Sequence, residues 1–320
     1  MNRIIDIINR HRSFLIASHV RLDGDALGSE LALYQMLLNM GKDVIVYNQD
    51  ETPGNYRFLP GSDKIVHRLP PLNKCEAVFI LDCSEFERIG DEAARIGGME
   101  RIINIDHHVS NRNFGSIVIV DHSASSTAEL LYSIMVKMGA DITRDMATNL
   151  YAAIITDTGG FCYGNTRKDT LIAAGNLVGK GADPQWISEN VYETNPLSKI
   201  RLLTKVLETL SFDWDRKVGY MVVYRKDFKD VGALMEHTEG FVDIPRSIEG
   251  VEVSILFTEM SDNQFKLSLR SKGKANVERV AAAFGGGGHI NAAACHIDGD
   301  FETVLRKVLE AISSSQQISG

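Results

Sequence analysis

The amino-acid sequence predicts an α/β protein with a mostly parallel sheet and helices on both faces, followed by a smaller α+β domain. Over the first half of the chain, short runs of β-branched residues alternate with longer amphipathic segments, which is typical of parallel strands joined by crossover helices. From about residue 212 the pattern changes to closely spaced strands followed by helices. A length of 320 residues allows two domains with separate cores.

The first half contains the elements of the predicted parallel sheet. Apolar, β-branched runs predict strands at residues 14–18, 44–47, 77–81 and from Ile102 onward. Helical periodicity and capping residues predict helices at residues 26–40, 126–138, 143–156 and 166–179. Residues 50–73 hold four of the seven prolines, so we expect a loop with short helical pieces there.

The second half is predicted to begin with a helical connector. The helical pattern from residue 183 to about 210 breaks at Asn195-Pro196, because a residue before proline disfavours helical angles. We therefore expect a first domain at residues 1–185, a helical hinge at 186–211 and a second domain at 212–320. In the second domain we expect antiparallel strands at 217–224, 251–258 and 265–269, helices at 276–284 and 302–312, and a frayed tail at 313–317.

Composition and charge exclude several classes of protein. A formal charge of −8 argues against a protein that coats long nucleic acid through phosphate contacts, but not against a small phosphorylated substrate held by metal ions. The start of the chain lacks the apolar core of a secretory signal, and no run of about 18 apolar residues predicts a membrane span. Widely spaced cysteines favour reduced thiols in a cytoplasmic protein; they are Cys75, Cys83, Cys162 and Cys295.

Polar side chains follow the predicted strands where each strand ends. Ligands of open α/β sheets bind outside the carboxyl ends of the strands, so these side chains are expected to share one basin. The set is His19, Asp23, Asp25, Asp82, Asp106, His107, His108 and, after the helix at 143–156, Asp157. Any one of them alone would be read as a turn, cap or core residue, but their occurrence at successive strand ends predicts a shared site.

The chemistry of this set predicts metal ions. Five carboxylates in one basin would repel one another unless positive charge lies between them. Oxygen and imidazole ligands without thiolate favour Mn²⁺ or Mg²⁺, although Co²⁺ or Zn²⁺ fits the same ligand types. The number of ligands predicts two ions, about 3.5–4 Å apart, as in sites for in-line displacement at phosphorus.

In order and spacing, these residues resemble the four motifs of the DHH phosphoesterase superfamily. The matching segments are His19-x-x-x-Asp23-x-Asp25, Asp82, Asp106-His107-His108 and Asp157-Thr158-Gly159. In the second domain, Arg270-Ser271-Lys272 and Gly285-Gly286-Gly287-Gly288-His289 resemble the signature of the DHH-associated domain. Within the superfamily the chain is most similar to the NrnA-type nanoRNases, although Leu22 stands where the family usually has proline, and Ile290 follows His289 where proline is common.

The resemblance implies a role for each motif. His19, Asp23 and Asp82 would hold one metal ion, and Asp25, Asp82, His107 and Asp157 the other, with Asp82 bridging. Asp106 would orient an imidazole, and His108 would contact the phosphoryl oxygen or protonate the leaving oxygen. The implied substrate-binding residues are Arg270, Ser271, Lys272, Gly286, Gly287, Gly288 and His289, and glycine backbone N–H groups can approach an anion closely.

The expected activity is manganese-dependent degradation of very short RNA to nucleoside 5′-monophosphates, together with dephosphorylation of 3′-phosphoadenosine 5′-phosphate. Closure of the second domain over the substrate through the Asn195-Pro196 connector is expected to accompany it. Phosphodiesterases of cyclic or linear dinucleotides and small-molecule phosphatases of the same superfamily are the alternatives. A nucleotide-binding regulatory module without catalysis is the alternative from another class, and a homodimer is compatible with the sequence.

Overall fold

The chain forms two compact units, Met1–Thr194 and Asn195–Gly320, in the computed structural model. The structure describes residues 1–213, 215–273 and 275–315. The division falls inside the predicted hinge, at the break that proline imposes. Helix α7 (Pro184–Tyr192) ends the first unit and α8 (Leu197–Leu207) begins the second, with Pro196 as its N-cap residue.

The first unit is built on a five-stranded sheet in which all the paired strands are parallel. Its order is β2-β1-β3-β4-β5, so the direction of strand addition reverses between β1 and β3. The bounds are β1 (Ser13–Ala17), β2 (Asp43–Tyr47), β3 (Ala77–Leu81), β4 (Ile102–Asp106) and β5 (Ile117–Val120). Strand β5 was not among the predicted strands; it has only four residues, all half-buried at the sheet edge.

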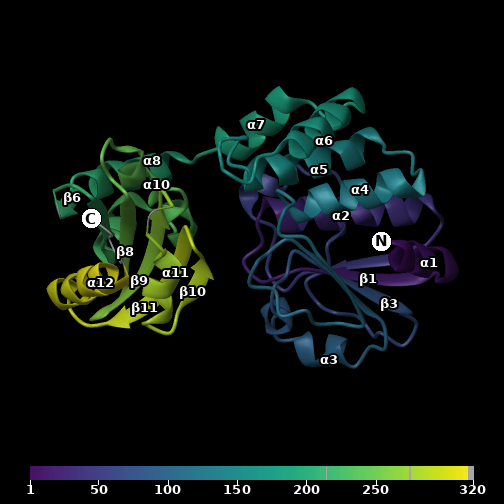
Figure 1. Cartoon of the computed structure of the whole chain (residues 1–320), viewed down its shortest axis with the longest axis horizontal. Helices are drawn as coiled ribbons and strands as arrows, with labels where there is room; N and C mark the ends of the chain where they lie inside the picture. Colours follow the sequence, from purple (N-terminus) through teal and green to yellow (C-terminus); the bar gives the residue numbers. More distant parts are fainter. Residues whose placement is uncertain (214, 274, 316–320) are drawn as a thin grey trace. The chain divides into compact units, whose positions relative to one another are not determined.

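Helices cover both faces of this sheet (Figure 1). The helices of the unit are α1 (Asn2–Arg10), α2 (Gly24–Asn39), α3 (Ala93–Gly97), α4 (Thr127–Met138), α5 (Arg144–Asp157), α6 (Lys168–Gly179) and α7. Short 3-10 turns occur at η1 (Gly54–Tyr56), η2 (Ser62–Lys64) and η3 (Phe86–Ile89). Helix α2 starts two residues earlier than predicted, because Asp23 caps it by accepting a hydrogen bond from Ala26 N.

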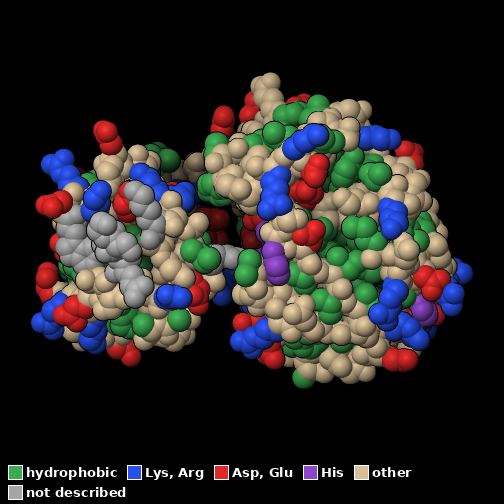
Figure 2. All heavy atoms as spheres, viewed as in Figure 1, with side chains coloured by type: hydrophobic (Ala, Val, Ile, Leu, Met, Phe, Trp, Pro, Cys, Tyr) green, Lys and Arg blue, Asp and Glu red, His purple; other side chains and the backbone are tan. Residues whose placement is uncertain are grey.

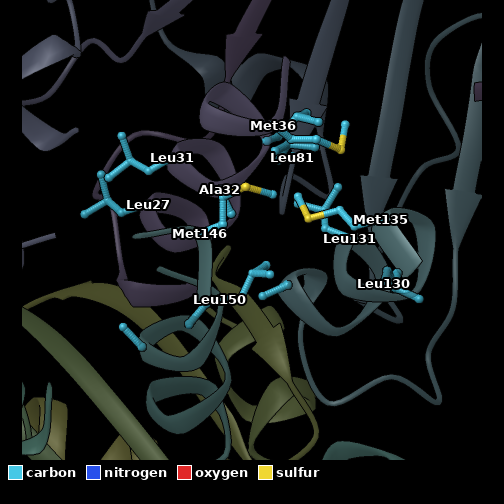
Figure 3. Close-up of a cluster of buried hydrophobic side chains, with 14 of the residues drawn as sticks. Leu27, Leu31, Ala32, Met36, Leu81, Leu130, Leu131, Met135, Met146 and Leu150 are labelled. Atoms are coloured by element: carbon cyan, nitrogen blue, oxygen red, sulfur yellow. The ribbon is translucent and has the colours of Figure 1, made fainter. Parts of the chain in front are cut away.

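Two apolar layers hold the sheet between the helices. Phe14 and Ile16 of β1 pack into the layer formed with α2, α4 and α5, whereas Leu15 and Ala17 pack into the opposite layer with Ile96 of α3. Figure 3 shows the first layer, where leucine and methionine side chains of the three helices meet Leu81 of β3. This arrangement confirms the predicted fold class.

The second unit contains a mixed six-stranded sheet of order β10-β11-β9-β8-β7-β6. The strands are β6 (Ser211–Asp213), β7 (Val218–Val223), β8 (Val253–Ser261), β9 (Gln264–Ser271), β10 (Gly287–His289) and β11 (Ala292–Asp298). The prediction that all three central strands are antiparallel was wrong for one pair: β7 and β8 are parallel, whereas β8 and β9 form an antiparallel hairpin. Parallel strands need a long crossover, and it is supplied by α9 (Arg225–Val231), η4 (Met235–Thr238) and α10 (Asp243–Ser247).

Two further helices, α11 (Val277–Ala282) and α12 (Phe301–Ser315), pack on the second sheet. Helix α12 includes residues 313–315, which were expected to fray, while Gln316 and Gln317 lie outside the described residues. On the face shown in Figure 2, acidic and basic side chains are interspersed over both units. Among the described helices, none has the length and apolar composition needed to cross a membrane. All four cysteines are free thiols.

Candidate metal centre

The predicted ligands of the first unit meet at one edge of its sheet. His19 follows β1, Asp82 follows β3 and Asp106 ends β4, while α2 begins beside this edge and α5 ends there. The parallel strands bring these residues together because their carboxyl ends face the same way. Three groups of Asp and His atoms lie close enough to hold metal ions: His19/Asp23/Asp82, Asp25/His107/Asp157 and Asp82/Asp106/His107/His108.

The first group surrounds His19. Its Nε2 atom lies 3.6 Å from Asp23 Oδ2 and 3.6 Å from Asp82 Oδ2. The other ring nitrogen, Nδ1, lies 2.8 Å from the carbonyl oxygen of Val20, to which it donates when it carries the proton. That hydrogen bond directs the Nε2 lone pair toward the two carboxylates, which is the usual second contact of a metal-ligating histidine.

The second group surrounds His107. Its Nε2 atom lies 3.3 Å from Asp157 Oδ2, 3.6 Å from Asp82 Oδ1 and 3.8 Å from Asp25 Oδ2. Burial lowers the pKa of His107, so the ring is neutral at physiological pH. A neutral imidazole facing three carboxylates suits a divalent cation.

Asp82 lies beside His107 as well as His19, and we therefore count it with both groups. Its Oδ2 faces His19 and its Oδ1 faces His107, so each oxygen serves a different group. The residue is buried and adopts a left-handed backbone conformation with φ of 52°. Asparagine and aspartate tolerate this region better than most residues, and such backbone conformations are concentrated at functional sites.

Helix α4 provides contacts that sequence reasoning missed. The backbone N–H groups of Thr127 and Ala128 donate to Asp25 Oδ2 and Oδ1 at 2.6 and 3.0 Å. The Thr127 hydroxyl donates to Asp82 Oδ1 at 3.0 Å. The sequence signal at this position was the N-cap Ser126, which indicated a helix start but not what the helix start contacts. Ser126 caps the helix by accepting the N–H of Glu129, and the Glu129 carboxylate accepts hydrogen bonds from Ser125 and Thr170.

Asp106 supports His108 through a separate network. Asp106 Oδ1 lies 2.6 Å from His108 Nδ1 and accepts the backbone N–H groups of His107 and His108. Asp106 Oδ2 accepts from Asn111 Nδ2 at 2.6 Å, and the same nitrogen lies 2.8 Å from Asn104 Oδ1. Although burial opposes ionisation, the hydrogen bond to His108 and its charge lower the pKa of Asp106 to about 2. Asn111 was also not predicted.

The pKa shifts indicate a site that binds positive charge. Burial and the charges of neighbouring carboxylates, Asp82 first among them, raise the pKa values of Asp25 and Asp157 well above the usual range. Burial alone would lower the pKa of His19, but hydrogen bonds with Asp23 and Asp82 raise it to about 10. These three side chains therefore hold protons that offset the negative charge of the carboxylates, and bound cations would supply the same positive charge. The oxygen and imidazole donors fit divalent ions of the Mn²⁺ or Mg²⁺ type.

The predicted substrate-binding residues lie in the second unit. Arg270 Nε is 4.0 Å from Asp243 Oδ1, Lys272 Nζ donates to Ile248 O, and the buried Ser271 donates its hydroxyl to Ala275 O. Residues 287–289 form strand β10, which pairs with β11. A Cβ atom on Gly286 or Gly288 would lie 2.2 or 2.4 Å from a carbonyl oxygen of β11, so this pairing requires glycine. The side chain of His289 lies outside the described part of the structure.

Comparison with known proteins finds similarity along most of the chain. A model of the DHH family N-terminal domain matches residues 13–154, and a model of the DHHA1 domain matches residues 216–315. The bifunctional oligoribonuclease and PAP phosphatase NrnA of Thermus thermophilus is 34% identical over 93% of this chain and 88% of its own length. The corresponding Bacillus subtilis protein is 26% identical over 89% of this chain and 90% of its own length.

A solved structure is also similar to the chain along most of its length. The crystal structure of an exopolyphosphatase-related protein from Bacteroides fragilis has a TM-score of 0.91 and 30% identity, and the match covers 98% of this chain and 95% of that one. The similarity in sequence and in fold therefore extends over both units.

Proposed function

Because the chain belongs to the DHH family and carries a DHHA1 domain, we propose that it is a manganese-dependent phosphodiesterase that degrades very short RNA to nucleoside 5′-monophosphates. The observation that carries this proposal is the pair of Asp and His groups that share Asp82. Two divalent ions bound in such a site neutralise the charge that develops at phosphorus during in-line displacement. The oligoribonuclease named among the relatives supports RNA as the substrate.

We assign the ligands by the two groups. His19, Asp23 and Asp82 would hold one ion, and Asp25, Asp82, His107 and Asp157 the other. Mn²⁺ is the ion of choice for this mixture of carboxylate and imidazole, with Mg²⁺ or Co²⁺ as alternatives. In this assignment Asp82 would be a ligand of both ions.

His108 and Asp106 are assigned to the substrate side of the reaction. Asp106 accepts from the Nδ1–H of His108 when that nitrogen carries the proton, and so fixes the orientation of the ring. His108 would then contact a phosphoryl oxygen or protonate the leaving oxygen. Both roles need the ring held in place, which the 2.6 Å contact with Asp106 provides.

The second unit would bind the anionic end of the substrate. Arg270 and Lys272 supply positive charge, and Gly286, Gly287 and Gly288 allow the backbone to approach an anion closely. The N–H of Gly286 itself donates to Ala281 O, so its contribution would be this close approach. Ser271 and His289 complete the set. The KM of an Arg270→Ala variant for RNA tests the assignment, because loss of a phosphate contact raises KM.

A second activity, dephosphorylation of 3′-phosphoadenosine 5′-phosphate, is favoured by the relatives, which are named as PAP phosphatases as well as oligoribonucleases. The products separate the possible activities. Short RNA yields nucleotide monophosphates, a cyclic dinucleotide yields a linear one, and the phosphoadenosine substrate yields orthophosphate.

The test is a turnover assay on the purified chain with Mn²⁺ and a labelled RNA ladder. We expect dinucleotides to pentanucleotides to be consumed faster than long strands. Asp82→Asn should reduce turnover by about a hundredfold or more, because it removes the negative charge that both groups share and replaces one ligand oxygen with an amide nitrogen. Asp145→Asn is the matched control, since Asp145 is an exposed residue in the first turn of α5 and contributes to neither group. Equal rates on short and long RNA would contradict the proposed substrate.

A further inference from the structure

Thr127 contacts the one carboxylate that the two groups share. It is fully buried at the first position of α4, and its hydroxyl donates to Asp82 Oδ1 at 3.0 Å. Its backbone N–H donates to Asp25 Oδ2 at 2.6 Å. One residue therefore restrains two carboxylates, one just after β3 and one in α2, which lie far from it in the sequence.

The hydroxyl contact distinguishes the two oxygens of Asp82. The oxygen that Thr127 binds, Oδ1, lies 3.6 Å from His107 Nε2, whereas Oδ2 lies 3.6 Å from His19 Nε2. His108 Nδ1 lies 3.5 Å from the same Oδ1, but it is closer to Asp106 Oδ1, at 2.6 Å, so the Thr127 hydroxyl is the shorter contact to this oxygen of Asp82. Without the hydroxyl, Asp82 loses the hydrogen bond that holds Oδ1 in this orientation, and rotation of the carboxylate would move Oδ1 away from the His107 side.

We propose that Thr127 is a positioning residue that directs one oxygen of Asp82 to each metal ion and thereby sets the affinity of the ion on the His107 side. The inference rests on the two-metal site of the proposed function. It adds a residue outside the Asp and His motifs to that site. The effect should be larger on the His107 side, since Thr127 binds Asp82 Oδ1 and Asp25, both of which face His107.

Two variants of the full chain separate the hydroxyl from the shape of the side chain. Thr127→Val keeps the shape and removes the hydroxyl, whereas Thr127→Ser keeps the hydroxyl and removes a methyl group. Each metal-free protein is titrated with Mn²⁺ and followed by electron paramagnetic resonance, which distinguishes single ions from a coupled pair. Circular dichroism and thermal unfolding of the metal-free proteins verify that the variants fold.

We expect Thr127→Val to need about tenfold more Mn²⁺ than the wild type to form the pair, and Thr127→Ser to behave like the wild type. In a His19→Ala background the Thr127→Val change should lower the affinity for the remaining Mn²⁺ ion. This decrease should be larger than the one that the same change causes in a His107→Ala background. Pair formation in Thr127→Val at the wild-type Mn²⁺ concentration, or an equal defect in Thr127→Ser, would overturn the inference. A wild-type protein that forms no Mn²⁺ pair would instead overturn the proposed function itself.

Discussion

At the residue scale, Glu30 shows that burial near the site changes the ionisation of a group that is not a proposed ligand. Glu30 is fully buried in α2, where its Oε2 accepts a hydrogen bond from Asn48 Nδ2 at 2.7 Å. Among the described residues, its Oε1 has no hydrogen-bond partner. Burial raises the pKa of Glu30 from 4.5 to about 8, so the side chain is largely protonated at neutral pH.

Glu30→Gln should therefore alter how stability depends on pH. In the wild type the folded state binds a proton that the unfolded state releases above its pKa of 4.5, so stability falls as pH rises from about 4.5 to about 8. Glutamine keeps an acceptor for Asn48 and has no such proton. We expect the variant to gain stability relative to the wild type across this window, by up to roughly 5 kcal/mol. Urea unfolding at several pH values measures it, and a pH-independent difference would contradict the assignment.

Residue type and position at strand ends made the candidate metal groups predictable. The sequence indicated His19, Asp82 and His107 because the fold itself rarely requires a carboxylate or an imidazole at the end of several successive strands. Thr127 and Asn111 were not predictable in the same way. A threonine in the first turn of a helix and an asparagine in a loop are common, and only the folded contacts with Asp82 and Asp106 give them a role.

At the element scale, the spacing between α2 and α5 determines how far apart two proposed ligands lie. Asp25 is in the first turn of α2, and Asp157 is the last residue of α5. The two helices pack closely at Gly28, where an added Cβ atom would lie 2.3 Å from Asn149 O and 2.8 Å from Ala153 Cβ. A backbone oxygen cannot move aside without moving the helix.

Gly28→Ala should therefore separate the two helices. Overpacking of this kind costs about 1–3 kcal/mol, and we expect Mn²⁺ affinity to fall as Asp25 moves from Asp157. Gly175→Ala in α6 is the matched control, because an added Cβ atom there meets no atom within 4 Å. It should stabilise the protein by about 0.5–1 kcal/mol through helix propensity and leave Mn²⁺ binding unchanged. Thermal unfolding and Mn²⁺ titration measure both variants. Equal stability and equal Mn²⁺ affinity of the two variants would show that the close contact at Gly28 does not control the spacing of Asp25 and Asp157.

The elements that the sequence predicted correctly are those with long, strongly apolar patterns. Strands β1, β3 and β4 are buried throughout or nearly so, and their composition identified them. Strands β5, β6 and β10 have three or four residues each, which is too short for a periodic pattern. The direction of β7 relative to β8 depends on the crossover between them, and no distinct sequence pattern marks the short helices that form this crossover.

At the scale of the whole molecule, each unit has its own hydrophobic clusters. Two clusters flank the parallel sheet of the first unit, and two others flank the mixed sheet of the second. All the proposed metal ligands lie in the first unit. The two-domain organisation was predicted from the change of pattern near residue 212 and the break at Asn195-Pro196, where the structure has the end of α7 and the start of α8.

Mn²⁺ should therefore stabilise the first unit selectively. Crowded, buried carboxylates destabilise the metal-free site, and a ligand at a hundred times its Kd adds about 2.7 kcal/mol per site. Hydrogen–deuterium exchange of the full chain measures the effect strand by strand. We expect amides of β1, β3 and β4 that exchange by global opening of the unit to slow by about a hundredfold for each Mn²⁺ ion bound at this concentration, and amides of β8 and β9 to be unchanged. Asp82→Asn should abolish the slowing, and equal protection of both sheets would contradict binding confined to the first unit.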